Sequence, residues 1–377
     1  MENRTAEELI YLARCGITGT IPDSSRISQM DLEAVYSLAR RHMIASAAAM
    51  ALEGAGVSDS RFSSAAAAAQ RKAIIFERVL QDVRGELENS GIWYMLLKGA
   101  VLKDMYPRFG MREFADYDIL IDASRAADAK EIMERLGFTT ESFGGGVHDV
   151  YHRAPLLNFE IHSALFGPGH DSRLYEYYQN VEERLTGDGY EKHFTPEDFY
   201  LYFLAHEYKH YSSGGTGLRS LMDTFVFLSS CEPDMDYVSA EADKLGILEF
   251  EHQNRMLSMH LFGEGELTES DARMLDYILS SGTYGTITHR VQNKLIKNGW
   301  SKLRYMLDRF LVPVRKSNRN YDSFSNRYPF FYRYKVFLPV LPFYRTFLSI
   351  RGGRFLPEAR AIRRADTDPS ESVTNAE

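Results

Sequence analysis

The chain contains little cysteine and no long hydrophobic run. Only two of its 377 residues are cysteine, Cys15 and Cys231, and they lie far apart without the spacing of metal ligands. This excludes a disulfide framework and is typical of a reducing compartment. The longest apolar candidate, residues 336–344, contains two prolines and is shorter than the ~20 residues that a membrane helix needs. The acidic N-terminus has no apolar segment for export. We therefore expect a cytoplasmic protein without a transmembrane segment.

The composition is that of a folded protein with more than one domain. Hydrophobic residues make up 44% and charged residues 25% of the chain, which is ordinary for globular proteins. Strand and helix patterns alternate only in the middle of the chain, which predicts an α/β or α+β domain between helical regions. We predict an N-terminal helical region (1–90), an α+β core (91–194), a C-terminal helical domain (195–364) and a disordered tail (365–377).

Helix signals mark several boundaries. A helix is expected from Asp31 through Leu52, and a long one from about Asp59. Ser124 is expected to cap a helix over Arg125–Leu136, and Thr195-Pro196 opens another. The remaining helices are predicted at 196–212, 217–230, 235–246, 248–262, 270–281, 286–310 and about 325–350.

Two aspartates one residue apart are the most informative feature. Asp116 and Asp118 lie in the stretch Asp-Tyr-Asp-Ile-Leu-Ile, which has the apolar, β-branched character of a buried strand. Side chains at i and i+2 of a strand point to the same face. Two carboxylates so placed repel each other unless a cation lies between them. Mg²⁺ is the expected cation because hard ions bind carboxylate oxygens.

The neighbouring segments add a glycine turn and a third acid. The apolar run 92–97 predicts a strand, and it is followed by Lys98-Gly99 and a short helix. Such a turn lets backbone amides approach a phosphate. Glu160 lies within a predicted strand, 156–162, where an unpaired carboxylate is costly to bury. We predict that Asp116, Asp118 and Glu160 converge.

Histidines flank this third acid. His162 shares the strand face of Glu160, and His148 and His152 lie on a predicted strand over 147–153. The last two are typical of partly exposed hairpin residues rather than of ligands.

These segments resemble the nucleotidyltransferase fold of the polymerase-β type, with a glycine turn, Asp-x-Asp and a later acid. The stretches Leu-Lys-Gly-Ala-Val-Leu (97–102), Arg-x-x-x-Asp-x-Asp (112–118) and Phe-Glu-Ile-His (159–162) resemble a poorly characterised bacterial branch, related to abortive-infection toxin nucleotidyltransferases. The resemblance covers about residues 85–165 and implies the α+β class, with a small mixed sheet flanked by N-terminal helices and a C-terminal helical domain. Many members of the fold have Gly-Ser at the turn, whereas the corresponding pair in this chain is Lys98-Gly99 or Gly99-Ala100, without a hydroxyl for the terminal phosphates.

The resemblance implies transfer of a nucleoside monophosphate from a nucleoside triphosphate to a hydroxyl acceptor by two-metal, in-line displacement. Asp116, Asp118 and Glu160 would be the catalytic and metal-binding residues, with Mg²⁺ as cofactor. The nucleotide phosphates would contact five further positions: Lys98, Gly99, Arg112, His210 and Arg219. An alternative for Arg112 is an ion pair with Asp116 or Asp118. The donor base and the acceptor, which could be a small molecule, a protein or RNA, are not indicated.

Two other functions stay open. One is a catalytically inactive binding protein with the same fold. The other is a zinc hydrolase, because His206-Glu207-Tyr208-Lys209-His210 matches H-E-x-x-H on a predicted helix. Lys209 is unusual in that motif. A third zinc ligand would have to come from Asp223, Glu249 or Glu251.

The basic residues are concentrated near the C-terminus. Residues 290–364 contain 18 Lys or Arg and three acids, a net charge of +15, so the rest, with 26 basic and 49 acidic residues, carries −23. The segment could pack on the chain's own acidic surface, bind nucleic acid with its interspersed aromatic residues, or bind an anionic membrane. A polyanion contact through 290–364 is therefore a candidate interaction.

Overall fold

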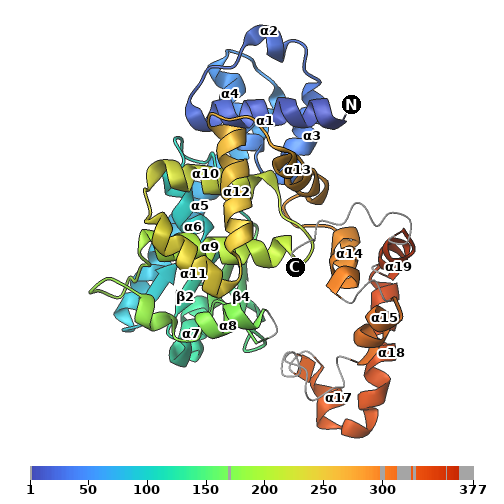
Figure 1. Cartoon of the computed structure of the whole chain (residues 1–377). Helices are drawn as coiled ribbons and strands as arrows, with labels where there is room; N and C mark the ends of the chain where they lie inside the picture. The colour runs from blue at the N-terminus through green and yellow to red at the C-terminus, as the bar shows by residue number, and fades with distance from the viewer. Residues whose placement is uncertain are drawn as a thin grey trace.

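A computed structural model describes residues 2–168, 171–297, 302–311, 324–325, 328–353 and 355–364. Figure 1 shows a sheet in the lower half of the main body, helices around it, and a C-terminal arm beside it. The predicted α+β class is confirmed, with one five-stranded mixed sheet. The predicted tail, 365–377, lies outside the described residues.

The sheet has the strand order β1-β2-β5-β4-β3. Within the described strands only β2 and β5 pair in parallel, and their register places Asp118 opposite Glu160. All five residues of β2 are buried, which explains its continuous apolar run. The strands are β1 (Tyr94–Leu96), β2 (Tyr117–Ile121), β3 (Thr139–Ser142), β4 (His148–Arg153) and β5 (Leu157–His162).

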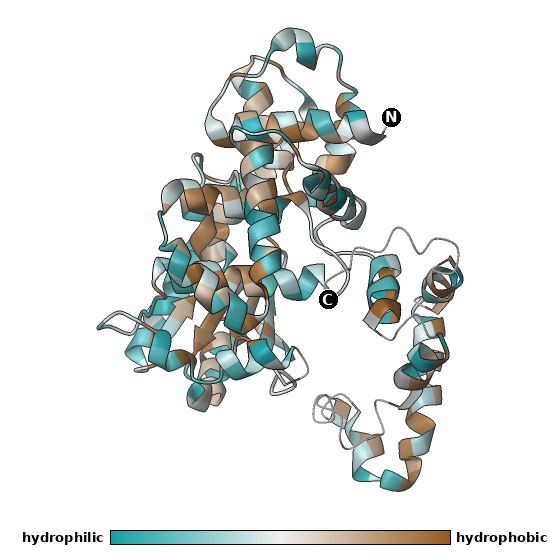
Figure 2. Cartoon of the chain, in the orientation of Figure 1, coloured by the Kyte–Doolittle hydropathy of each residue, from teal (hydrophilic) through white to brown (hydrophobic). Residues whose placement is uncertain are grey.

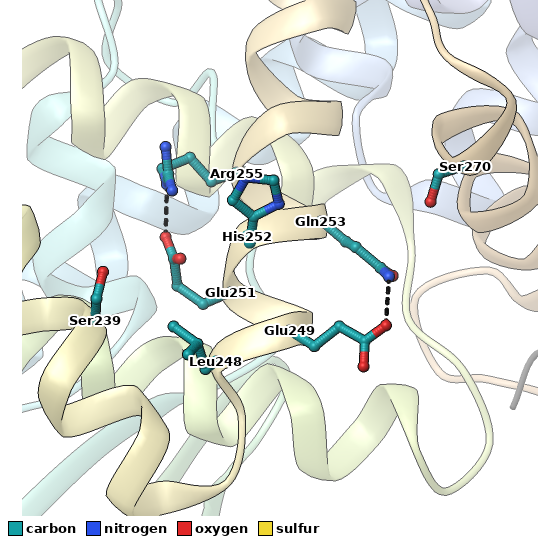
Figure 3. Close-up of a pocket in the computed structure, with 8 residues that line it drawn as sticks. All are labelled: Ser239, Leu248, Glu249, Glu251, His252, Gln253, Arg255 and Ser270. Carbon is teal, nitrogen blue, oxygen red and sulfur yellow. Dashed lines mark hydrogen bonds and ion pairs between the residues drawn. The ribbon is translucent and has the colours of Figure 1, made fainter. Parts of the chain in front are cut away.

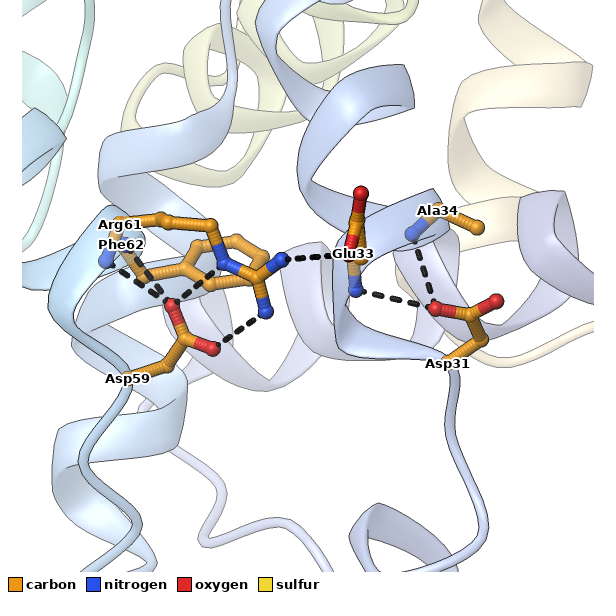
Figure 4. Close-up of polar contacts among 6 residues, drawn as sticks. All are labelled: Asp31, Glu33, Ala34, Asp59, Arg61 and Phe62. Carbon is orange, nitrogen blue, oxygen red and sulfur yellow. Dashed lines mark hydrogen bonds and ion pairs between the residues drawn. The ribbon is translucent and has the colours of Figure 1, made fainter.

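Aspartates cap the N-termini of α2, α3 and α5. The Asp31 carboxylate accepts hydrogen bonds from the amides of Glu33 and Ala34, both at 3.1 Å, and the Asp59 carboxylate accepts one from the Arg61 amide at 2.9 Å (Figure 4). Each cap satisfies amides that have no partner inside the helix. The helices are α1 (Glu2–Thr18), α2 (Ser24–Ile27), α3 (Leu32–His42), α4 (Ala45–Gly54) and α5 (Ser60–Asn89).

The prediction of one helix from Asp31 to Leu52 is wrong. Met43 has φ 55° and ends α3 in the left-handed conformation, so α4 begins in a new direction. The alanine-rich composition does not reveal this break, because helix propensity alone favours continuation.

The connections within the core are short helical turns. After β1 come α6 (Gly99–Leu102) and η1 (Lys103–Met105), and after β2 come η2 (Ala123–Arg125) and α7 (Ala126–Arg135). The predicted Ser124 cap is wrong. The Asp122 carboxylate accepts hydrogen bonds from the Ser124 amide at 2.8 Å and the Ser124 hydroxyl at 2.7 Å, so Asp122 is the capping residue.

The C-terminal helices and the N-terminal helices share one apolar core. Leu9 and Leu12 of α1 and Leu257 and Leu261 of α12 belong to the same buried cluster. The predicted Thr195 cap is confirmed, because its hydroxyl accepts from the Asp198 amide at 3.2 Å. The elements are α8 (Ser172–Tyr177), η3 (Val181–Arg184), α9 (Pro196–Tyr211), α10 (Leu218–Ser230), α11 (Met235–Leu245), α12 (Leu248–Phe262) and α13 (Glu269–Ser281).

The arm begins with α14, which packs against α19 (Figure 1). The prediction of one helix over 325–350 is wrong, because η5 contains Pro339 and separates α17 from α18. Residues 298–301, inside the predicted helix 286–310, lie outside the described residues. Within the described ranges, no helix combines the length and apolar character that crossing a bilayer requires. The elements are α14 (Ile287–Lys297), α15 (Lys302–Leu311), α17 (Pro329–Arg333), η5 (Lys335–Val340), α18 (Leu341–Arg351) and α19 (Phe355–Arg364).

Candidate active site

The acidic residues come from one loop and two strands. Asp118 is on β2 and Glu160 is on β5, side by side in the parallel register. Asp116, however, precedes β2 and lies in the loop, so the expectation that both aspartates lie on the strand is wrong. Lys72 of α5 fixes this loop, because its Nζ donates to the carbonyl oxygens of Phe114 at 2.9 Å and Ala115 at 2.8 Å.

The three predicted acids are close enough to interact electrostatically. Burial raises the pKa of Asp116 to about 6, and the carboxylates of Asp118 and Glu160 add to the rise. Like charges in a partly desolvated site have this effect. The site therefore carries more negative charge than its surroundings fully compensate.

Asp118 itself is compensated by two neighbours. Its Oδ1 accepts from Lys98 Nζ at 3.0 Å and lies 2.8 Å from His162 Nε2. Burial alone would raise the pKa of Asp118, but Lys98 and His162 outweigh burial and hold it well below its usual range. The same contact raises the pKa of His162, although burial opposes the rise. Lys98 and His162 thus stabilise the charged form of Asp118, whereas the carboxyl of Asp116 has no such contact among the residues that the structure describes.

The Lys98-Gly99 turn has unusual backbone geometry. Lys98 has φ 43° and ψ −112°, which is strained for a residue with a side chain and is characteristic of functional sites. A Cβ on Gly99 would lie 2.4 Å from Arg112 Nη1. The absence of a side chain at Gly99 therefore makes room for the Arg112 guanidinium.

Arg112 pairs with a residue that the sequence did not suggest for it. Arg112 Nε lies 2.7 Å from Asp223 Oδ1, and Nη2 lies 2.8 Å from Oδ2. The Tyr106 hydroxyl donates to the same carboxylate at 2.7 Å. The alternative in which Arg112 pairs with Asp116 or Asp118 is therefore wrong. Arg112 ties the loop before β2 to helix α10.

Helix α9 contributes side chains that sequence reasoning did not assign to the site. Burial and the nearby Lys98 lower the pKa of Lys209 to about 8, against the attraction of Asp118 and Glu160. Burial and Lys98 also lower the pKa of His206 well below its usual value. Tyr202, His206 and Lys209 recur at four- and three-residue intervals, which places them on one face of a helix. That spacing was visible in the sequence.

The two remaining predicted phosphate contacts differ in position. His210 is exposed, and its Nε2 lies 3.3 Å from His206 Nε2. Arg219 Nη1 donates to the Glu113 carbonyl oxygen at 2.9 Å, beside the loop that carries Asp116. The positive charge of Arg219 lowers the pKa of Asp116, against the larger opposing effect of burial.

The H-E-x-x-H segment lacks the surroundings of a zinc site. Glu207 is buried and accepts a hydrogen bond from Asn254 Nδ2 at 2.9 Å. Each proposed third ligand has another partner: Asp223 binds Arg112, Glu251 binds Arg255 at 2.7 Å and Glu249 binds Gln253 at 3.0 Å. Figure 3 shows the last two pairs at a hollow of about 570 Å³, which none of the residues predicted for nucleotidyl transfer lines.

A different cluster fits a metal ion. His148, Glu160 and His162 form the one group of three or more candidate ligands in the described part of the chain. Glu160 Oε2 lies 3.6 Å from His148 Nε2 and 3.6 Å from His162 Nε2. His148 is partly exposed on the β4–β5 hairpin, as expected, and it also lies beside the predicted site, in a candidate ligand set with Glu160.

Comparison with known proteins identifies the family. The sequence model of a family described as uncharacterised nucleotidyltransferase matches residues 28–263. Neither a search of curated proteins nor a search of solved structures gave a match. The matched segment includes the loop of Asp116, strands β2 and β5, and helix α9. The chain belongs to the uncharacterised nucleotidyltransferase family.

Proposed function

We propose that the protein transfers a nucleoside monophosphate from a nucleoside triphosphate to a hydroxyl acceptor with Mg²⁺ as cofactor. The observation that carries this proposal is the parallel register of Asp118 and Glu160, with Asp116 beside them. Family membership supports nucleotidyl transfer in general. The metal, the donor and the mechanism are our inference from the site.

The chemistry of three carboxylates suits Mg²⁺, although in the described residues their oxygens do not form an assembled ligand group as the ligand atoms of His148, Glu160 and His162 do. Three carboxylates supply the oxygen ligands that a hard divalent cation prefers. Burial and the repulsion from Asp118 and Glu160 together raise the pKa of Asp116 to about 6, and a divalent ion would relieve the repulsion. Asp116, Asp118 and Glu160 would hold the metal, which when bound stabilises the attacking and leaving oxygens of an in-line displacement.

The cationic side chains near the carboxylates are candidates for binding the phosphates of the nucleotide. Lys98 contacts Asp118 at 3.0 Å, so a metal at that carboxylate frees the ammonium group to bind a phosphate. Lys209 of α9 interacts electrostatically with Asp118 and Glu160. Arg219 of α10 interacts in the same way with Asp116. We assign these three cations to the β- and γ-phosphates and to the departing pyrophosphate. His210 and the Gly99 amide stay predicted contacts.

Labelled nucleotides test the activity directly. Each of the four labelled nucleoside triphosphates is incubated with the protein and Mg²⁺, and label is followed in protein, RNA and small-molecule fractions. We expect label in one fraction with wild-type protein and none with Asp118→Asn. Asp104→Asn is the matched control, because Asp104 is an exposed aspartate. Equal transfer by Asp118→Asn would remove Asp118 from the mechanism.

The alternative function for the same fold is that of a catalytically inactive binding protein. It predicts nucleotide binding without transfer, or no binding at all. Calorimetry with each nucleotide and Mg²⁺ separates the two: binding without label in any fraction supports the inactive protein.

The basic arm is the remaining predicted contact. Phe343 is 65% exposed and Val336 79% exposed, and Figure 2 shows apolar segments alternating with polar ones along the arm. Exposed aliphatic and aromatic groups beside Arg345 and Arg351 favour an anionic lipid surface over nucleic acid, because aliphatic side chains do not stack on bases. We propose that contact for the arm.

A further inference from the structure

We propose that His148, Glu160 and His162 bind a first-row divalent transition metal ion of the zinc and cobalt class. The inference deepens the proposed function and rests on it for the role of the ion, since Glu160 belongs to both ligand sets. The binding itself depends only on the geometry of strands β4 and β5.

The sheet brings the three side chains together. His148 is paired with His162 across the antiparallel β4–β5 ladder, and Glu160 is two residues from His162 on the same face of β5. The two imidazole ring centroids are 4.9 Å apart. Three residues on two adjacent strands form a more rigid ligand set than residues on a loop.

The distances suit a small ion. Glu160 Oε2 lies 3.6 Å from the Nε2 atom of each histidine, and the three ligand atoms lie within 4.8 Å of one another. Tetrahedral coordination with bonds of ~2.0–2.1 Å separates neighbouring ligand atoms by roughly 3.4 Å. The two separations from Glu160 are within a few tenths of an ångström of this value, whereas the two histidine nitrogens, which lie within 4.8 Å of each other, have room for a larger approach.

The donor atoms select the class of metal. Two imidazole nitrogens and one carboxylate match zinc and other first-row transition ions, whereas Mg²⁺ prefers oxygen alone. Asp118 Oδ1, 2.8 Å from His162 Nε2, is within reach as a further oxygen ligand. The ion would thus share Glu160 with the proposed Mg²⁺ ligands, and its fourth position would be filled either by Asp118 or by substrate or water.

The surroundings limit the affinity but leave the site accessible. The Nδ1 atoms of His148 and His162 are buried without a hydrogen-bond partner. Partners at that position typically strengthen metal binding 10–100-fold, so we expect weaker binding than at a structural zinc site. The His148 side chain is 37% exposed, which gives an ion a route to the cluster.

Cobalt binding tests the site without nucleotide. Co²⁺ is titrated into the full-length protein, with visible absorption and calorimetry as readouts. We expect one Co²⁺ per chain, with the visible absorption of a cobalt ion that has few ligands, including nitrogen. Zn²⁺ should displace the Co²⁺. A wild-type protein that binds no Co²⁺, or binds it with the spectrum of an all-oxygen octahedral site, overturns the inference.

Substitutions locate the ion. His148→Ala should weaken Co²⁺ binding at least tenfold. His152→Ala is the matched control, since His152 is on the same strand but pairs with Glu141, and it should bind as the wild type does. Unchanged binding in His148→Ala would refute the assignment. Circular dichroism checks the fold, and if His148→Ala is misfolded, His148→Gln, which keeps the side-chain volume, replaces it.

The outcome for the inference is separable from that for the proposed function. If the protein binds no Co²⁺ but the wild type transfers label in the presence of Mg²⁺, the proposed function stands and the metal site does not. Conversely, a Co²⁺ site in a protein that transfers no nucleotide leaves the metal site intact and removes its proposed role.

Discussion

Glu207 provides a test of the fold's electrostatics and of the zinc alternative together. Its carboxyl group is buried between α9 and α12, where it accepts a hydrogen bond from Asn254. Burial raises the pKa of Glu207 from 4.5 to about 8, and Asp223 adds to the rise. We predict that Glu207→Gln stabilises the protein at pH 8, because glutamine resembles the protonated acid and needs no proton.

The magnitude follows from proton linkage. Between pH 4.5 and about 8 the folded state keeps a proton that the unfolded state has released, so stability falls as pH rises through this window. The loss is ~1.36 kcal/mol per pH unit. Removing the carboxyl should therefore add about 4 kcal/mol to the free energy of unfolding at pH 8 but only about 1 kcal/mol at pH 5.

Urea unfolding at the two pH values measures the effect. Glu249→Gln is the control, because Glu249 is exposed on α12 and its substitution should change stability little at either pH. A Glu207→Gln variant that is less stable at pH 8, or whose difference from wild type does not depend on pH, would refute the reasoning. A Glu207 that acts as a general base in a zinc site would instead be required for a metal-dependent hydrolytic activity.

Three further predictions address the ion pair, the pH response and the arm. Arg112→Ala should lower the free energy of unfolding by about 3–5 kcal/mol, because it leaves the buried Asp223 carboxylate without its ion-pair partner. Urea unfolding measures the loss, and the double variant with Asp223→Ala should recover part of it. A loss under ~1 kcal/mol would contradict a buried ion pair. Mg²⁺ affinity should fall below pH 6, because the carboxyl of Asp116, with its pKa raised to about 6, must lose its proton to bind the ion. Calorimetry at pH 5 and pH 7.5 tests this. Equal affinities at the two pH values would count against Asp116 as a ligand. The arm, residues 290–364, should bind anionic vesicles but not neutral ones, and salt should weaken the binding. Sedimentation with vesicles measures it. Binding that salt does not weaken, or binding to nucleic acid alone, would exclude the lipid contact.

Local pattern was sufficient for the strands and for most helix ends. The apolar run around Asp118 predicted β2, and the i+2 relation of Glu160 and His162 predicted their common face. Thr195 and Asp59 marked helix starts correctly. These features depend on residues close in sequence, so periodicity and capping chemistry describe them.

Contacts between distant segments were not predictable in the same way. Arg112 pairs with Asp223, 111 positions later, and nothing near Arg112 distinguishes that partner from Asp116 or Asp118. Lys209 was interpreted as an anomaly in a zinc motif, whereas its helix lies over the carboxylates. His148 reaches Glu160 only through the β4–β5 register, which a single sequence does not specify.

Calorimetry of a nucleoside triphosphate, with and without Mg²⁺, tests the central claim that Asp118 acts on the nucleotide through a metal ion. In wild-type protein Mg²⁺ should strengthen nucleotide binding. In folded Asp118→Asn that gain should disappear, while binding without Mg²⁺ should be equal or tighter, because one negative charge near the phosphates is gone. An undiminished gain from Mg²⁺ in Asp118→Asn would contradict the account.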